Sequence, residues 1–218
     1  MSSSEEPPVV TFALLGETYY VTDYVQVNNP HMKAIAEKLN AESNDDAIEK
    51  ALQVTCGELA YPINWKGAPA PERHTKVFKW WDGFFLTDEG EKKYGWLLPN
   101  QIAVTRKGIC IDSACFCATL LRILKIETYV VLGAIIDTRT KKILGFHAWV
   151  VARKSDGKQY LLETTIHPIT PPLIPVEDAY EGRLKIVYDP IISFNEAEYH
   201  EDPEKVEKYE RILEQHIA

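Results

Sequence analysis

Three residues that together could form a nucleophilic catalytic site occur in order in the second half of the chain. Cys110 comes first, His147 follows within an apolar segment, and Glu163 comes last, directly before two threonines. These residue types can supply a thiol nucleophile, the base that takes its proton, and a carboxylate that orients the base. The order therefore predicts acyl transfer through a thioester on Cys110.

The surroundings of Cys110 favour a reactive thiolate at the start of a helix. Gly108 permits a tight turn just before it, and Arg106 and Lys107 add positive charge. At a helix start, free backbone N–H groups and the helix dipole favour the thiolate. Asp112 is expected to support the first turn without a chemical role. The helical spacing of the following apolar residues predicts one buried face, made of Ala114, Ala118, Leu121 and Leu124.

The predicted strand over residues 143–152 places His147 and Trp149 on one face, because side chains alternate along a strand. His147 would accept the thiol proton and later protonate the leaving amine. Glu163 would fix the tautomer and orientation of the ring. The alternatives are a core histidine and an ordinary strand-end carboxylate. His167 is a rival orienting residue or a surface residue.

An oxyanion formed during the reaction needs hydrogen-bond donors. The backbone N–H of Cys110 is one candidate, and the side chain of Gln101 or Asn100 could supply a second, although Asn100 also suits a turn or helix cap. Trp96 and Trp149 could wall the cleft and exclude water, or could belong to the core.

The other three cysteines, Cys56, Cys115 and Cys117, are interpreted as packing residues. Three of the four cysteines crowd into one predicted helix, which does not suit disulfides and indicates a reducing compartment. Their spacing lacks the paired C-x-x-C or histidine cluster of a zinc site, so no metal site is predicted. Thiol acyl-enzyme chemistry needs no cofactor.

Length and charge limit the class of protein. A chain of 218 residues can bury one sizeable core. Its formal net charge of −8 argues against binding nucleic acid or an anionic membrane through bulk charge. No apolar run is long enough to span a bilayer, and no secretory signal follows the polar residues 1–8. We therefore expect a cytoplasmic protein.

The first half of the chain is predicted to contain two helices and a long irregular region. Residues 1–8 are expected to form a flexible arm, followed by extended segments over 9–15 and 18–27. Helices are predicted over 30–39, capped by Asn29, and from Asn44 or Asp45 to about residue 59. The aromatic segment 61–99 lacks periodicity, which is typical of a loop over a cleft and suggests a lid.

The second half is predicted to be a helix followed by an antiparallel meander, which indicates the α+β class. The helix runs from Cys110 to about Leu124, and the strands cover residues 128–136, 143–152 and 159–165. The prolines between 168 and 175 favour a wrapping loop. A further strand over 183–188 and a final helix over 202–217, charged on most faces, complete the prediction.

These motifs resemble the transglutaminase-like superfamily, whose core is related to the papain fold, and in particular its microbial members. The likeness rests on Gly-x-Cys-x-Asp-x-Ala over 108–114, His-Ala-Trp-Val over 147–150, and Glu-Thr at 163–164, with a Trp–Pro lead-in over 96–99. It covers about residues 44–165. It implies one domain over 9–218, with residues 166–218 as a C-terminal wrap and helix.

The expected function is therefore a cysteine-dependent enzyme acting on an amide of a protein or peptide. The resemblance favours hydrolysis of a peptide or isopeptide bond. The alternatives are a transglutaminase that joins a glutamine amide to an amine, and a non-catalytic protein-binding module. An N-acetyltransferase would need a coenzyme A pocket, which no glycine loop or basic cluster supports. The substrate and the oligomeric state stay open.

Overall fold

The structure is a computed structural model, and it describes most of the chain. The described residues are 9–11, 18–59, 74–77, 84–87, 90–93, 96–106, 108–165 and 173–217. The predicted arm over 1–8 lies outside them, as do His167, Lys107 and much of the aromatic segment 61–99, so the predicted lid is not described.

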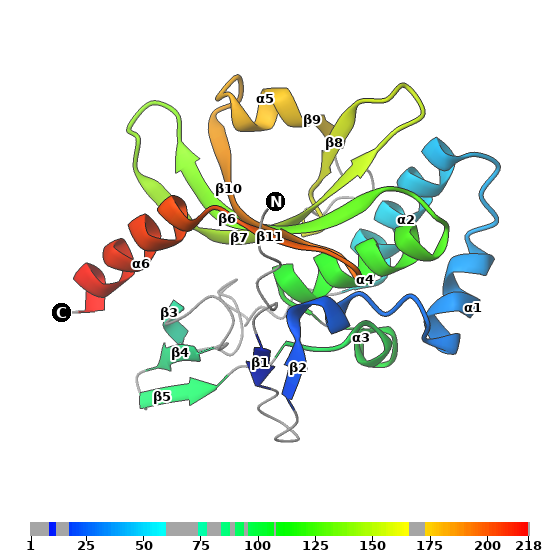
Figure 1. Cartoon of the computed structure of the whole chain (residues 1–218), viewed down its shortest axis with the longest axis horizontal. Coiled ribbons are helices and arrows are strands. Elements are labelled where there is room, and N and C mark those ends of the chain that lie inside the picture. The colour runs from blue at the N-terminus through cyan, green and yellow to red at the C-terminus, as the bar shows by residue number, and fades with distance from the viewer. Residues whose placement is uncertain are drawn as a thin grey trace, which may run out of the picture.

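A six-stranded antiparallel sheet forms the centre of the protein (Figure 1). Every neighbouring pair of its strands runs antiparallel. In spatial order the strands are β11 (Tyr199–Glu201), β10 (Ile186–Phe194), β6 (Thr128–Asp137), β7 (Ile143–Arg153), β8 (Gln159–Leu162) and β9 (Leu173–Pro175). The long β6–β7 hairpin lies in the middle, and the C-terminal β10 is inserted beside β6.

Helices cover both faces of this sheet (Figure 1). Helix α4 (Cys110–Ile123) packs on β6 and β7 from one side, and α1 (Pro30–Lys38), α2 (Asn44–Glu58) and α3 (Pro99–Thr105) pack around it. Helix α5 (Val176–Tyr180) contacts β8, β9 and β10 on the other side. Alternate residues of β6 therefore enter two separate cores, Val130 and Leu132 beneath α4 and Val131 beneath α5. This arrangement confirms the predicted α+β class.

The remaining elements are short, apart from the last helix. Strands β1 (Val9–Thr11) and β2 (Thr18–Tyr20) pair with each other and precede the 3-10 helix η1 (Val21–Tyr24). Strands β3 (His74–Val77), β4 (Phe84–Thr87) and β5 (Gly90–Lys93) form a second antiparallel sheet. Helix α6 (Pro203–Ile217) ends the described chain.

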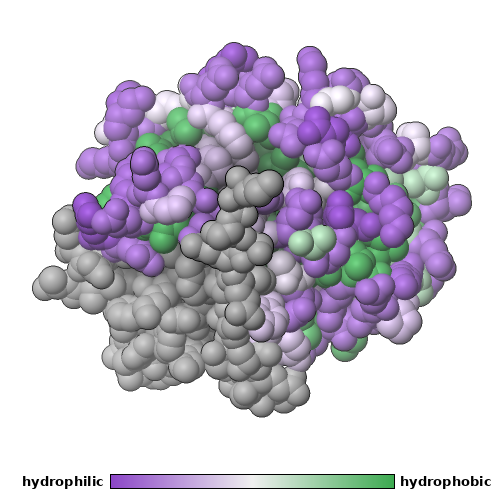
Figure 2. All heavy atoms as spheres, viewed as in Figure 1, coloured by the Kyte–Doolittle hydropathy of each residue, from purple (hydrophilic) through white to green (hydrophobic). Residues whose placement is uncertain are grey.

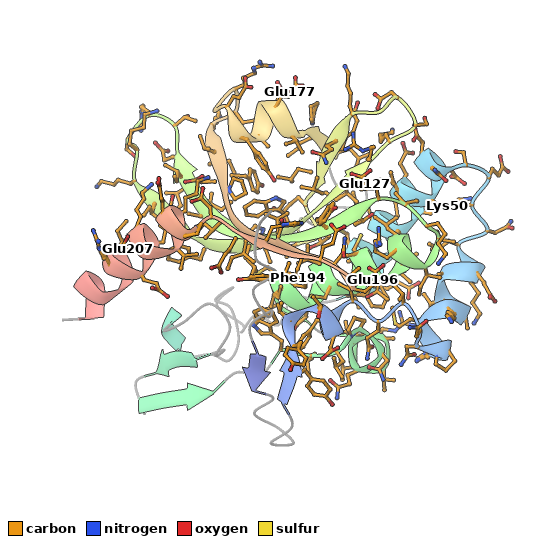
Figure 3. All side chains as sticks on the ribbon, in the orientation of Figure 1. Lys50, Glu127, Glu177, Phe194, Glu196 and Glu207 are labelled. Atoms are coloured by element: carbon orange, nitrogen blue, oxygen red, sulfur yellow. The ribbon has the colours of Figure 1, made fainter. Side chains whose placement is uncertain are left out.

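Helix α4 is buried on all sides. Residues 111–121 are each buried, and several, including Phe116 and Leu121, are completely inaccessible. Phe194, at the end of β10, is fully buried in the same core (Figure 3). At the far end of the helix Arg122 pairs with Glu196 beyond β10, with Nε to Oε2 at 2.8 Å. Only the first residue of the helix, Cys110, is partly exposed before this buried stretch.

The polar surface agrees with the acidic composition. Figure 2 shows one face on which hydrophilic side chains predominate around small hydrophobic areas. Glu177 and Glu207 are exposed on α5 and α6, and Lys50 pairs with Asp46 one turn earlier on α2 at 2.7 Å (Figure 3). Glutamates on exposed helix positions cost nothing in desolvation, which is why these helices tolerate so many of them.

The predicted elements of the first half need three corrections. Asn29 caps α1 as predicted, since its Oδ1 accepts hydrogen bonds from the backbone of residues 31 and 32. Helix α2, however, is capped by Ser43, whose Oγ accepts from the backbone N–H of Asp46 at 3.2 Å. The extended segment over 18–27 turns into η1 after residue 20. The segment 61–99 contains β3 to β5 and the start of α3, so its prediction as wholly irregular was wrong.

The second half corresponds closely to prediction up to residue 165. Helix α4 and strands β6 and β7 confirm the predicted ranges to within one or two residues. Strand β8 stops at Leu162, so Glu163 follows the strand rather than lying in it. The wrapping segment contains β9 and α5, and the predicted strand over 183–188 begins later and continues to Phe194 as β10.

Helix α6 is less solvated than its many charges suggest. Tyr209 is completely buried, and its ring meets that of Phe146 edge-on, with centroids 5.7 Å apart. The Tyr209 hydroxyl donates to Asp189 Oδ2, and Lys205 Nζ donates to Asp189 Oδ1, each at 2.5 Å. The helix is therefore held to β10 through Asp189, which corrects the prediction of a helix that is charged on most faces.

Gly133 of β6 is required by close packing, and this generates a stability prediction. A Cβ there would lie 2.2 Å from the Asp189 carbonyl oxygen and 2.4 Å from the Trp149 ring. We expect Gly133→Ala to lower the free energy of unfolding by about 3 kcal/mol, because a backbone atom cannot move aside cheaply. Urea denaturation measures the change.

Gly145 of β7 is the matched control, because a Cβ there meets nothing within 4 Å. Gly145→Ala is expected to change the free energy of unfolding by less than about 1 kcal/mol. Equal losses for both variants would contradict the packing argument.

Candidate active site

The edge of β7 is left open where β8 departs, and the candidate site lies there. Strand β8 pairs with β7 only over residues 150–153. His147 lies beyond this stretch and pairs with Gly133 of β6 on its other side. The last paired residue of β8 is Leu162, opposite Val150, so the chain leaves the sheet at Glu163, beside the histidine. The register thus brings the two predicted residues together.

Glu163 binds His147 through both carboxylate oxygens. Nε2 of His147 lies 3.0 Å from Oε1 and 2.8 Å from Oε2. The side chain of Glu163 is 3% exposed and that of His147 is 19% exposed. The longer glutamate side chain therefore reaches the ring, and the pair is largely shielded from water, which strengthens its electrostatic interaction.

Further donors hold the Glu163 carboxylate from its other sides. Thr165 donates to Oε1 from its backbone N–H at 3.1 Å and from its hydroxyl at 2.7 Å. Tyr188 of β10 donates its hydroxyl to Oε2 at 3.0 Å. Burial raises the pKa of Glu163, but the hydrogen bonds and charge of His147 and the Thr165 hydrogen bonds outweigh it and lower that pKa below its usual value. Glu163 is therefore ionised at neutral pH.

Cys110 is the second group that influences the His147 ring. Burial lowers the pKa of His147, but hydrogen bonding and charge from Cys110 and from Glu163 raise it to about 10. Because Nε2 is occupied by Glu163, Nδ1 is the ring nitrogen left for the thiol. The imidazole is thus protonated at neutral pH, because it interacts with the ionised Glu163 carboxylate and with the Cys110 thiol.

The Asp112 side chain fixes the start of α4. Cys110 is its first residue, and Ile109 has extended backbone angles and provides the cap. The Asp112 carboxylate accepts the backbone N–H of Ile109 through Oδ2 and that of Leu97 through Oδ1, each at 2.9 Å. Asp112 is completely buried. It supports the first turn, as the sequence indicated, and it also ties segment 96–98 to the helix.

Two interpretations around the helix start need correction. Gly108 does not have a positive φ; a Cβ there would instead lie 2.8 Å from the Asp112 Cβ, so glycine is needed for space. Arg106 was expected to add positive charge near Cys110. Its guanidinium forms an ion pair with Glu58 of α2, which offsets that charge.

The other cysteines are structural, as predicted. Cys56, Cys115 and Cys117 are buried, and Cys110 is the one cysteine of the four that is partly exposed. Burial raises the pKa of Cys56 and of Cys117 to about 12 and raises that of Cys115 well above its usual value. Cys56 also donates its thiol to the backbone oxygen of Glu163 at 3.6 Å. Reactivity is therefore expected at Cys110 alone.

The residues considered for an oxyanion site lie at the start of α3. The Gln101 side-chain oxygen accepts the backbone N–H of Leu98 at 3.0 Å, which caps the helix. The backbone N–H of Asn100 donates to the side-chain oxygen of Gln26 at 3.0 Å. Trp96 is 4% exposed and packs edge-on against Tyr24, with ring centroids 5.3 Å apart. Trp96 therefore belongs to the core beneath the site.

Trp149 lies behind His147 and not on a cleft surface. It is completely buried, with its ring centroid 6.4 Å from that of His147. Its Nε1 donates to the Tyr180 hydroxyl at 3.2 Å. The two residues do share one face of β7, as their spacing predicted. At Trp149, side chains from α5 and from β10 cover that face.

Sequence reasoning missed the contribution of Tyr188. This residue lies 25 positions after Glu163, on β10. The pairing of β10 with β6 cannot be predicted from a local sequence pattern. The tyrosine ends a short apolar run over 186–188, which predicts burial but not a partner. Thr165 was part of the motif that singled out Glu163, so its proximity could have been anticipated.

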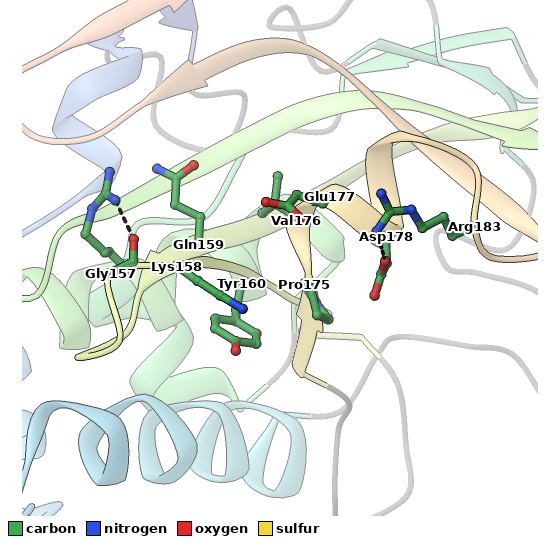
Figure 4. A pocket seen from close by; sticks show the side chains of 10 residues that line it. Gly157, Lys158, Gln159, Tyr160, Pro175, Val176, Glu177, Asp178 and Arg183 are labelled. Atoms are coloured by element: carbon green, nitrogen blue, oxygen red, sulfur yellow. Dashed lines mark hydrogen bonds and ion pairs between the residues drawn. The ribbon is translucent and has the colours of Figure 1, made fainter.

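Other features do not add to this site. No cluster of histidine, cysteine, aspartate or glutamate suited to a metal occurs among the described residues. A polar depression of about 500 Å³ lies across β8, β9 and α5 (Figure 4). Its two arginines are already paired, Arg153 with Glu127 at 2.8 Å and Arg183 with Asp178 at 2.9 Å. None of the residues around Cys110 lines it.

A cysteine at a helix start, a histidine on the neighbouring strand and a carboxylate just beyond it define a papain-like arrangement. The chain belongs to the transglutaminase-like domain family, which it matches over residues 30–181. The family match thus extends beyond the predicted core of 44–165 at both ends.

Some solved structures are distantly similar to this chain. One is LapG of Legionella pneumophila, with 12% identity and a TM-score of 0.47 over 89% of this chain and 94% of that one. Another is red sea bream transglutaminase, with 13% identity and a TM-score of 0.45 over 97% of this chain and 45% of that one. No curated protein sequence matches the chain. In the part of the chain that the structure describes, no helix has the length and apolar character needed to cross a membrane.

The His147–Glu163 pair predicts a pH-dependent stability difference. His147 has a raised pKa, so its contribution is complete below about pH 6.5 and is lost as pH rises through about 10. The pKa of Glu163 is lowered, so its contribution is present above 4.5 and is lost at lower pH. We expect Glu163→Gln to lower the free energy of unfolding by about 3 kcal/mol at pH 6 and by progressively less toward pH 10.

Urea denaturation at each pH measures this difference, and Glu196→Gln is the control. Glu196 pairs with Arg122, which stays charged throughout this range, and its side chain is partly shielded, at 23% exposed. Its loss should therefore be the same at pH 6 and pH 10. A Glu163→Gln loss that is also independent of pH would contradict the assigned protonation states.

Proposed function

We propose that this protein is a cysteine-dependent acyl-transfer enzyme that hydrolyses a peptide or isopeptide amide. The observation that carries the proposal is the buried contact between His147 and Glu163, on a ring that Cys110 also influences. One ring nitrogen is held by a buried carboxylate, and the thiol raises the pKa of the same ring. Membership of the transglutaminase-like family supports a thiol-dependent reaction.

In the first half of the proposed reaction, the Cys110 thiolate attacks the carbonyl carbon of the amide. The C–N bond breaks as the His147 imidazolium gives its proton to the leaving nitrogen. The products are a thioester on Cys110 and a free amine. Glu163 keeps the ring oriented and stabilises its charge until the proton leaves.

In the second half, His147 is a neutral base. It takes a proton from water as the water oxygen attacks the thioester carbonyl, and the C–S bond then breaks. The acid leaves, and the thiolate–imidazolium pair is restored. Each half-reaction moves one proton, and no external redox partner or cofactor is required.

The first position of a helix also suits stabilisation of the oxyanion. The backbone N–H of Cys110 lies in the first turn of α4, where such groups have no partner within the helix. It would donate to the carbonyl oxygen as negative charge develops there. Gln101 uses its side-chain oxygen in the cap of α3, which leaves its amide N–H groups for a second donation. Asn100 is the neighbouring alternative.

The nearest alternative function is amide transfer to an amine rather than to water, as in a transglutaminase. The description of the family as transglutaminase-like supports this alternative. The two reactions share every step up to the thioester. A protein or peptide is the proposed substrate in both. The four free thiols support a reducing compartment such as the cytoplasm.

Alkylation of the thiols tests the nucleophile. At pH 6 iodoacetamide is expected to modify Cys110 and to leave the other three cysteines intact, because an ordinary thiol has a pKa of about 8.5 and burial raises theirs further. Peptide mass spectrometry locates the modification. In His147→Ala the reaction of Cys110 at pH 6 should fall at least about tenfold, since the imidazolium is lost.

The same experiment can overturn the proposal. If Cys110 reacts no faster than Cys56 in the wild-type protein, or reacts equally in His147→Ala, the thiol is not activated. The chain would then be better described as a non-catalytic binding module on this fold.

The reaction itself is tested with a glutamine-containing and lysine-containing peptide library, with and without a labelled primary amine. Hydrolysis predicts new carboxylates, and added amine should not change their yield. Cys110→Ala should abolish turnover, and Glu163→Gln should reduce kcat by about 10²–10⁴ because the imidazolium loses its counter-charge. Incorporation of the labelled amine in preference to water would replace hydrolysis by transfer.

A further inference from the structure

Tyr188 contacts the same carboxylate oxygen that approaches His147 most closely. Its hydroxyl donates to Glu163 Oε2 at 3.0 Å, and that oxygen lies 2.8 Å from His147 Nε2. Tyr188 is 4% exposed. A donor that is shielded from water interacts more strongly with a carboxylate than an exposed donor does.

Tyr188 and Thr165 hold the two oxygens of Glu163 separately. Thr165 donates twice to Oε1, whereas Tyr188 is the side chain that donates to Oε2 besides the histidine. A carboxylate fixed at both oxygens cannot rotate about its last bond without breaking a hydrogen bond. Its plane, and therefore the orientation of the His147 ring, is thus determined from two segments of the chain.

The Tyr188 ring is itself held in place. It packs edge-on against Trp149, with centroids 5.1 Å apart. The next residue, Asp189, is bound by Lys205 and Tyr209 of α6, and its carbonyl lies against Gly133 of β6. The hydroxyl therefore has little freedom to leave the carboxylate.

We propose that Tyr188 is a positioning residue that keeps Glu163 ionised and oriented toward His147 during the reaction. The inference rests on the proposed function, because it assigns Tyr188 a role in that catalytic group. Tyr188 lies outside the segment 30–181 that matches the family. This contribution to the site therefore comes from the C-terminal part of the chain, through β10.

The titratable groups around the pair come from four elements. His147 on β7 and Tyr188 on β10 contact the Glu163 carboxylate directly. Cys110 on α4 raises the pKa of His147. Cys56 on α2 donates its thiol to the Glu163 backbone oxygen. The two thiols are present in all variants used below, so a difference between variants reports the hydroxyl that was removed.

Tyr188→Phe removes the hydroxyl and keeps the ring. Without this donor the carboxylate is held at one oxygen only and can rotate away from the ring, so its hydrogen bond to the imidazolium weakens and the pKa of His147 should fall by about one unit. Histidine NMR titration measures this, with His147→Ala used to assign the signal. Alkylation of Cys110 at pH 6 should slow, and kcat for amide hydrolysis should fall about tenfold with little change in KM.

Tyr180→Phe is the matched control. It also removes one tyrosine hydroxyl from the α5 side of the sheet, but that hydroxyl accepts from Trp149 Nε1 at 3.2 Å and does not contact Glu163. A similar fall in thermal stability is expected for the two variants, with the histidine titration and the alkylation profile changed only in Tyr188→Phe. Equal effects of both variants on the titration, or no effect of either, would overturn the positioning role.

The two proposals fail in distinguishable ways. If Cys110 is not activated in the wild-type protein, the proposed function fails, while the histidine titration still reports whether Tyr188 acts on the pair. If Cys110 is activated and Tyr188→Phe leaves the titration, the alkylation profile and kcat unchanged, the proposed function stands and the role of Tyr188 is overturned.

Discussion

The burial of the Glu163 carboxylate is the constraint on which the site depends. An ionised carboxylate that is 3% exposed must be compensated by partners, because the cost of removing its charge from water is several kcal/mol. Those partners are His147 on β7, Thr165 in the segment after β8, and Tyr188 on β10. Three segments must therefore meet at one point. The sheet order, with β10 beside β6 and β7 beside β8, is the arrangement that lets them do so.

A second buried carboxylate positions Cys110, the proposed nucleophile. Asp112 accepts backbone N–H groups from Ile109 and Leu97, so it joins the entry to α4 to the segment that begins α3. Residues 111–121 of the helix are buried, whereas Cys110 at its start is partly exposed to solvent. The site is thus assembled from two rigid bodies, a capped helix and a sheet edge, each fixed by a carboxylate that satisfies backbone or side-chain donors.

Local patterns were sufficient to predict the helix that begins at Cys110 and the strand that carries His147. The helix at Cys110 and the β6–β7 hairpin follow from periodicity and turn residues, whereas the pattern placed Glu163 inside a strand that in fact ends at Leu162. Features that depend on contacts between distant segments were not predictable in this way. Tyr188 is joined to the site by the register of β10 on β6, and Gly108 and Gly133 are required by neighbours that only the folded chain provides. The burial of Trp149 also depends on α5 and β10, which cover its face.

Glu163 is buried whereas His147 and Cys110 are partly exposed, and this difference explains how one site can be both shielded and accessible. The carboxylate is 3% exposed, the imidazole 19%, and the thiol is partly exposed. Charges interact strongly where water is excluded, so the buried end of the site is where the imidazolium is stabilised. The nucleophile, in contrast, must be reached by a substrate. A tyrosine hydroxyl at the buried end, held by a strand that α6 fixes in place, can therefore influence the reactivity of a thiol that it does not contact.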